Sequence, residues 1–174
     1  MKFVYNDGGR SGAGYKGSAG DCVCRAIAIA AEVPYQEVYD AINQASENER
    51  KSSRKRGKSS SRTGVYKATI RRYLELLGWT WVPTMHIGSG CKVHLTDGEL
   101  PMGRLIVSVS KHLTAVIDGV IHDTHDPSDR GVTIYPPYYP KDKLPKNAYW
   151  LDNGNGWAYS PDRCVYGYWY RVTP

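Results

Sequence analysis

The pair Asp118-Gly119 lies between two apolar runs rich in β-branched residues, KHLTAVI before it and GVIHDTHD after it. Asp-Gly in this setting is the strongest short-range signal for a β-hairpin with a two-residue turn. The turn fixes the register of the hairpin, so that Ile117 pairs with Val120. Because alternate residues of a strand face opposite sides of a sheet, this register determines which side chains of the two strands can meet.

Three helices are expected before the hairpin. A glycine-rich loop covers residues 5–20, and Asp21 is a good N-cap for a helix with small apolar residues at helical spacing. Pro34 suits the first turn of a second helix, and Thr63 can cap a third helix that Gly78 ends. From there the apolar period changes to two, which indicates strands in TWVPTMHI, GRLIVSVS and CVYGYWYRV beside the two hairpin strands.

This order of elements predicts an α+β fold in which N-terminal helices pack on a C-terminal antiparallel sheet. The length of 174 residues fits a single domain, 1–174. We expect a basic mobile loop at 46–62 and an irregular, aromatic and proline-rich excursion at 128–162. No apolar run approaches the roughly 18 residues of a membrane span, and the N-terminus has no signal segment, so we expect a cytoplasmic protein with no membrane partner.

The net charge of +6 comes from one short segment. Residues 50–62 hold seven basic and no acidic residues, so that outside them 16 Lys and Arg stand against 17 Asp and Glu, a balance of −1. Runs of Ser, Lys and Arg are usually solvated loops. They can also bind phosphates, and the segment 50–72 could bind nucleic acid without sequence specificity. The candidate phosphate contacts are Arg54, Lys55, Arg56, Lys58 and Arg62.

Cys22 directly follows the Asp21 cap, so its thiol lies in the first turn of a helix. The positive end of the helix dipole favours the thiolate, which is the nucleophilic form. Unpaired backbone N–H groups of the same turn, that of Cys22 included, can hold the oxyanion of a tetrahedral intermediate. Cys24 is the alternative nucleophile, but it is rotated away from Cys22 and is more simply explained as a packed side chain.

The hairpin adds a candidate general base. In the register set by the turn, His112 lies opposite His125 and is a diagonal neighbour of Asp123, at about 7–8 Å between backbones. Asp126 falls on the other face of the sheet. A Cys nucleophile, a His base and an Asp that orients the His are the elements of a thiol hydrolase. We therefore predict a catalytic triad of Cys22, His112 and Asp123 that cleaves a peptide, isopeptide or related amide bond.

Two segments, GDCVCRAIAIA and KHLTAVIDGVIHDTHDP, resemble the nucleophile helix and the His and Asp strands of the papain-like cysteine peptidase superfamily, in particular the bacteriocin-leader peptidases. The resemblance implies a papain-like fold, a thiol protease activity that needs no cofactor, and a protein or peptide substrate. Papain-like enzymes usually place a Gln shortly before the nucleophile, and this chain has none upstream of Cys22. Asn6, Ser18 or a backbone N–H of the glycine-rich loop would then complete the oxyanion hole.

Longer segments, TGVYKATIRRYLELLGWTWVPTMHIGSGCKVHL and RCVYGYW, are similar to a group of small uncharacterised phage and prophage proteins. The similarity implies a phage-encoded protein in the host cytoplasm, and it leaves a virion-associated location open. It also suggests a second function, in which a catalytically silent papain-like scaffold acts as a virion structural or host-interaction protein. Residues 128–162 would then bind the virion or host partner.

The four cysteines allow two further interpretations. In a chain without a secretory signal they are expected to be thiols rather than a disulfide framework. Zinc sites usually combine pairs of ligands with a characteristic spacing, which is missing here, and no metal site is predicted. The motifs considered were Cys22-x-Cys24, Cys91-x-x-His94 and His122-x-x-His125.

Overall fold

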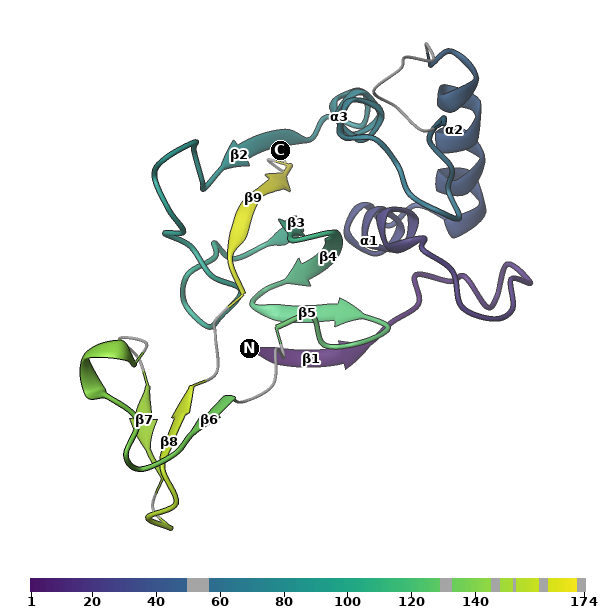
Figure 1. The fold of residues 1–174 in the computed structure, drawn as a ribbon. Helices are drawn as coiled ribbons and strands as arrows, with labels where there is room; N and C mark the ends of the chain where they lie inside the picture. Colours follow the sequence, from purple (N-terminus) through teal and green to yellow (C-terminus); the bar gives the residue numbers. More distant parts are fainter. Residues whose placement is uncertain (50–56, 129–132, 145–147, 152, 160–162, 172–174) are drawn as a thin grey trace.

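The computed structural model describes residues 1–174 except 50–56, 129–132, 145–147, 152, 160–162 and 172–174. In this part of the chain, three helices gather on one side of a six-stranded mixed sheet, and a second, three-stranded sheet stands apart from it (Figure 1). The predicted α+β class is therefore confirmed. No helix among the described residues has the length and hydropathy needed to cross a membrane.

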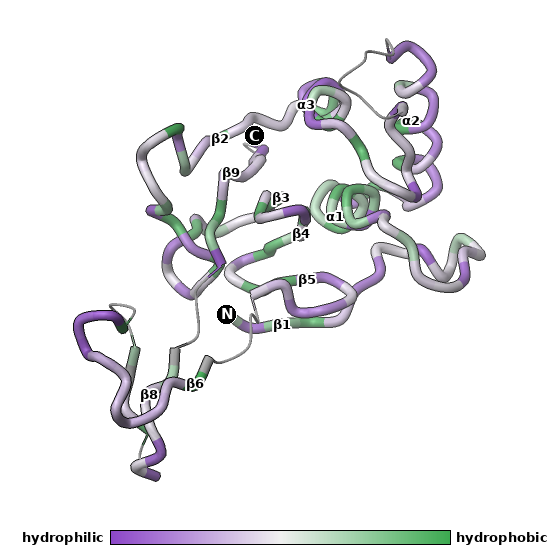
Figure 2. Tube along the Cα trace, in the orientation of Figure 1, coloured by the Kyte–Doolittle hydropathy of each residue, from purple (hydrophilic) through white to green (hydrophobic). Residues whose placement is uncertain are grey.

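The first helix, α1 (Cys22–Ala31), lies directly on the sheet. All of its residues from Val23 to Ala30 are buried, and its alanines allow close contact with the strands. The helices α2 (Tyr35–Glu47) and α3 (Lys67–Leu76) are amphipathic; α2 packs on α1, and α3 packs on α2 and on β2. Figure 2 shows the resulting contrast between the hydrophobic α1 and the mostly hydrophilic α2.

The start of α3 differs from the prediction. Thr63 does not cap this helix, because residues 60–64 form a short antiparallel bridge and α3 begins at Lys67. The bridge is docked on α2, where the hydroxyl of Ser61 donates a hydrogen bond of 2.7 Å to the carbonyl oxygen of Tyr39. The segment 46–62, expected as a mobile loop, thus begins inside α2 and ends in buried contacts, while residues 50–56 lie outside the described part.

The six-stranded sheet has the order β1-β5-β4-β3-β9-β2. It is not purely antiparallel as predicted, because β1 pairs in parallel with β5 at one edge. The N-terminal strand was missed because four residues carry too little periodicity to identify a strand. The strands of this sheet are β1 (Lys2–Tyr5), β2 (Thr80–Pro83), β3 (Arg104–Val109), β4 (His112–Ile117), β5 (Val120–Asp123) and β9 (Val165–Tyr170).

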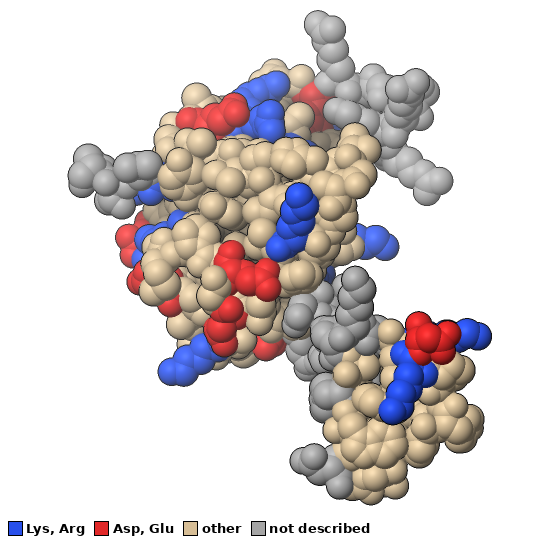
Figure 3. Space-filling view, turned by 90° about the vertical axis from the view of Figure 1, so that its left-hand side faces the viewer, with Lys and Arg blue, Asp and Glu red and all other residues tan. Residues whose placement is uncertain are grey.

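The excursion 128–162 is not irregular throughout, because its described residues form the three-stranded sheet β6-β8-β7 and a short 3-10 helix, η1. Figures 1 and 3 show this small sheet projecting from the main body of the molecule. Proline and aromatic residues obscured the strand pattern in the sequence. The elements are β6 (Thr133–Tyr135), η1 (Lys141–Lys143), β7 (Tyr149–Trp150) and β8 (Trp157–Tyr159).

Both faces of the main sheet are buried. The helices cover one face, and the segment that contains Leu95 and Leu100 covers the other. Cys91 and Cys164 form a disulfide that ties this segment to the start of β9, so the prediction of four thiols is wrong for these two residues. The backbone explains the proximity, because Val165 N–H donates to the carbonyl oxygen of Val93 at 2.8 Å. The free cysteines are Cys22 and Cys24.

Candidate active site

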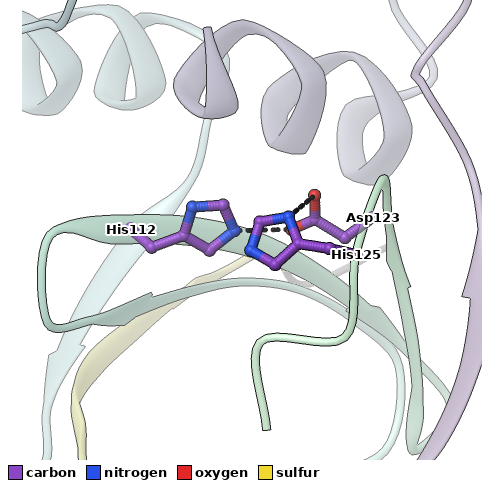
Figure 4. A group of neighbouring side chains, drawn as sticks. All are labelled: His112, Asp123 and His125. Atoms are coloured by element: carbon purple, nitrogen blue, oxygen red, sulfur yellow. Dashed lines mark hydrogen bonds and ion pairs between the residues drawn. The ribbon is translucent and has the colours of Figure 1, made fainter. Parts of the chain in front are cut away.

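The β4-β5 hairpin has the register predicted from its turn. Ile117 pairs with Val120, and Asp118 and Gly119 both adopt positive φ, at 47° and 76°. This conformation suits a two-residue hairpin turn. Away from the turn, the side chains of His112 and Asp123 point toward each other, as Figure 4 shows, with 2.7 Å between His112 Nε2 and Asp123 Oδ2. The two side chains are buried except for a tenth or less of their surface.

The start of α1 brings Cys22 to the same place. Cys22 is half-buried and lines a groove together with His112. Interactions with the His112 side chain and with the backbone N–H of Leu113 both lower the pKa of its thiol. His112 therefore neighbours Cys22 in the groove lining and is hydrogen-bonded to Asp123 through Nε2. The structure thus brings together all three residues that were predicted as a triad.

The electrostatics of the three groups favour charges of alternating sign. Burial raises the pKa of the Cys22 thiol, but the hydrogen bonds with His112 and Leu113 and the imidazolium charge bring it below its ordinary value of 9.0. Burial lowers the pKa of His112, but hydrogen bonds with Asp123 and Cys22 raise it from 6.5 to about 9. Burial raises the pKa of Asp123, but the hydrogen bond with His112, the His112 charge and the hydrogen bond from the Thr124 backbone together bring it below 3.8. The lowered pKa of Cys22 and the raised pKa of His112 both favour transfer of the thiol proton to the imidazole.

Asp21 occupies the N-cap position of α1, but its side chain makes no cap hydrogen bond. Its carboxylate is buried and forms ion pairs with Arg25 and with Arg10 Nε, the latter at 2.8 Å. The Tyr35 hydroxyl donates a further hydrogen bond of 2.6 Å to Asp21 Oδ2. Asp21 thus lies at the predicted N-cap position, but its carboxylate does not cap the helix. A buried carboxylate is stable only when cations compensate its charge, and here Arg10 and Arg25 do so.

Arg25 links this ion cluster to the triad. Its side chain is largely buried, and its Nη2 lies 3.9 Å from Asp123 Oδ1, on the carboxylate oxygen that His112 does not contact. Its charge also lowers the pKa of Cys22. Sequence reasoning missed Arg25, although an arginine one turn after Asp21 in an otherwise apolar helix was a signal for a buried ion pair.

The oxyanion site predicted at the Cys22 backbone agrees with the helix start, because no side chain caps the first N–H groups of α1. The structure does not bring the other two candidates to the groove. Asn6 Oδ1 accepts a hydrogen bond of 2.8 Å from Gly8 N–H, and Ser18 lies exposed in the glycine-rich loop. Neither residue lines the groove beside Cys22.

The alternative candidates have other partners. Cys24 is completely buried, its thiol lies 3.5 Å from the carbonyl oxygen of Ser61, and burial raises its pKa to about 12. Asp126 accepts hydrogen bonds from the backbone N–H and the hydroxyl of Ser128. Both observations favour Cys22 and Asp123 for the site. The His125 ring lies 4.8 Å from the His112 ring, as the register predicts.

Among the described residues, one group of three side chains has its potential metal-ligand atoms close together. The ligand atoms of His112, Asp123 and His125 lie within 4.8 Å of one another (Figure 4), but His112 and Asp123 are bonded directly, so an ion would have to replace that hydrogen bond. The motifs considered from the sequence are not assembled in this way. Cys91 is in the disulfide, and His94 Nδ1 lies 3.1 Å from Glu99 Oε2.

Of the candidate phosphate contacts, Lys58 and Arg62 are described and exposed. Lys58 Nζ donates a hydrogen bond of 2.6 Å to the carbonyl oxygen of Glu47 at the end of α2. Residues Arg54, Lys55 and Arg56 lie outside the described residues. Nucleic-acid binding through residues 50–72 therefore stays a prediction from the sequence.

The groove beside Cys22 has a volume of about 780 Å³ and is lined by the start of α1, by α3 and by residues of β2, β3, β4 and β9. Its size is typical of a site for a ligand or a short peptide segment. No family model, curated protein or solved structure matches this chain. Its function must therefore be inferred from the site itself.

Proposed function

We propose that this protein is a thiol hydrolase with a papain-like arrangement, in which Cys22 is the nucleophile, His112 the general acid and base, and Asp123 the residue that orients His112. One observation carries the proposal: Cys22 lines an open groove together with His112, whose Nε2 is hydrogen-bonded to Asp123. A nucleophile, a base and an orienting carboxylate in hydrogen-bond contact are the arrangement that covalent acyl transfer needs.

The reaction follows from the positions of these groups. The Cys22 proton resides on His112, and the thiolate attacks the carbonyl carbon of an amide in the groove. The backbone N–H groups at the start of α1 stabilise the oxyanion. His112 then donates its proton to the leaving amine, and a thioester with Cys22 remains. A water molecule gives a proton to His112 and attacks the thioester, which releases the acid and restores the thiol.

The sequence resemblance to papain-like peptidases supports the same assignment, and the similarity to phage proteins favours a phage-encoded enzyme that acts in the host cytoplasm on a protein or peptide. The upstream Gln of those peptidases has no counterpart before Cys22. In this chain, backbone N–H groups would provide the oxyanion contacts without it.

The test uses p-nitrophenyl acetate, a small activated ester that needs no specific recognition. We expect a burst of p-nitrophenol and an acetyl adduct on Cys22, detected by mass spectrometry of the intact and digested chain. The adduct should be absent in Cys22→Ala and strongly reduced in His112→Ala. Cys24→Ala is the matched control, because it removes the neighbouring thiol and should keep the burst. A burst that persists in Cys22→Ala would contradict the proposal.

A second function is supported by the small sheet. Ile134 and Trp150 of this sheet are 54% and 43% exposed, and Tyr138 in the turn after β6 is 86% exposed, which is unusual for large apolar groups. This surface suits the virion or host partner considered for residues 128–162. If that is the only function, the wild-type protein forms no acetyl adduct, and Tyr138→Ser weakens association with purified virions.

A further inference from the structure

The groove beside Cys22 combines an apolar wall with an unbalanced charge. Its lining includes three basic side chains, Lys67, Arg71 and Lys111, and no acidic one. All three are exposed, and none forms an ion pair with a carboxylate of the described residues. Lys67 and Arg71 are one turn apart on α3, so they share a face of that helix.

Lys111 adds a third positive charge to the groove lining from a different element. It belongs to the two-residue turn between β3 and β4 and directly precedes His112. Two separate elements, α3 and this turn, thus bring positive charge to the groove that Cys22 lines. Clefts lined by charges of one sign concentrate ligands of the opposite sign.

The apolar wall is formed by two tryptophans. Trp81 and Trp169 are paired across β2 and β9, with ring centroids 5.3 Å apart. Gly167 allows this arrangement, because a Cβ atom there would clash with the Trp81 ring. The half-buried Trp81 ring therefore offers a flat surface to an apolar side chain of a ligand.

We propose that the groove binds an acidic peptide segment, with an aromatic or large aliphatic side chain against Trp81 and Trp169 and carboxylates facing Lys67, Arg71 and Lys111. The inference rests on the proposed function only in that the scissile bond would lie at Cys22. A peptide fits better than a nucleic acid, because the Cys22 and His112 chemistry acts on acyl groups and the wall is apolar.

The test measures peptide binding separately from cleavage. Fluorescein-labelled pentapeptides with a central Phe or Gly, flanked by Glu or by Lys, are titrated with the full-length Cys22→Ala protein and followed by anisotropy. The Glu peptide with Phe should bind at least about tenfold more tightly than the Lys peptide with Phe, because several exposed ion pairs contribute a few-fold each. It should also bind more tightly than the Glu peptide with Gly.

Charge reversal on α3 provides the matched pair of variants. Arg71→Glu should remove most of the preference for Glu over Lys. Arg72→Glu should leave it unchanged, because Arg72 is equally exposed on the same helix but does not line the groove. Trp81→Ala should reduce the preference for Phe and keep the preference for Glu.

The inference is overturned if Glu and Lys peptides bind equally, if no peptide binds, or if Arg71→Glu and Arg72→Glu have the same effect. Tighter binding of a labelled oligothymidylate to the groove, lost in Arg71→Glu, would also overturn it in favour of nucleic acid. The same peptides incubated with the wild-type protein separate the two proposals. Selective binding without cleavage contradicts the hydrolase alone, whereas cleavage of the Lys peptide as fast as the Glu peptide contradicts the acidic preference alone.

Discussion

Replacing Asp123 by Asn removes the negative charge beside His112 and nearly preserves the shape of the side chain. In the wild-type protein the pKa of His112 is raised from 6.5 to about 9. At about 1.36 kcal/mol per pH unit, this is a preference of about 3 kcal/mol for the imidazolium form. Burial opposes that preference, and in Asp123→Asn only the interactions with Cys22 still counter it.

The assay is a pH titration of 15N-labelled histidine side chains by NMR. The midpoint of His112 should lie near pH 9 in the wild-type protein and fall by more than about one pH unit, toward 6.5, in Asp123→Asn. Asp126→Asn is the matched control, because Asp126 bonds to Ser128 and should leave the His112 midpoint unchanged.

The interaction between His112 and Asp123 also makes the free energy of unfolding depend on pH, in a direction that follows from the two pKa shifts. The raised pKa of His112 gives stability that is complete below pH 6.5 and is lost as the pH rises through about 9. The lowered pKa of Asp123 gives stability that is complete above pH 3.8 and is lost as the pH falls through its folded value. Asp123→Asn should thus lower the free energy of unfolding most between pH 3.8 and pH 6.5, where both contributions are complete. A wild-type His112 midpoint near 6.5, or an unchanged midpoint in Asp123→Asn, would refute the reasoning.

Three further changes test other parts of the structure. Arg25→Met should lower the free energy of unfolding by about 3 kcal/mol in urea titrations, because it leaves buried carboxylates with fewer cations; an unchanged midpoint would contradict the ion cluster. Replacing Cys91 and Cys164 by Ser should cost about 4 kcal/mol, as expected for a cross-link that spans 73 residues, and reductant should then have no further effect. Gly167→Ala should displace the Trp81 ring, lower stability by about 1–3 kcal/mol and shift tryptophan fluorescence, whereas a native spectrum would exclude the close packing.

The part of the site that could be predicted from sequence is the part that local geometry determines. Asp118-Gly119 fixed a two-residue turn, and the register that follows from it placed His112 beside Asp123. The position of Cys22 at a helix start was likewise a local property of the Asp21 cap region. That the helix start meets the hairpin depends on packing between distant segments, which only the resemblance to a known family suggested.

The features that were missed depend on contacts between residues far apart in sequence. The parallel pairing of β1 with β5 joins the N-terminus to the hairpin, and the four residues of β1 are too few to show the periodicity of a strand. The disulfide needs Cys91 and Cys164 to be brought together by backbone pairing across 73 residues. The Asp21 carboxylate forms ion pairs with Arg25 and Arg10, and this pairing follows from the burial of α1.

The most direct test of the central claim is the pH dependence of Cys22 alkylation by iodoacetamide, followed by mass spectrometry of digested protein. A sulfur paired with the His112 imidazolium should react at a lower pH than an ordinary thiol of pKa 9.0, and His112→Ala should move the rate profile up toward that of an ordinary thiol. Cys24, whose pKa is raised to about 12, should stay unmodified in the folded protein. If Cys22 reacts only at alkaline pH, or reacts identically without His112, the proposed thiolate–imidazolium pair does not exist.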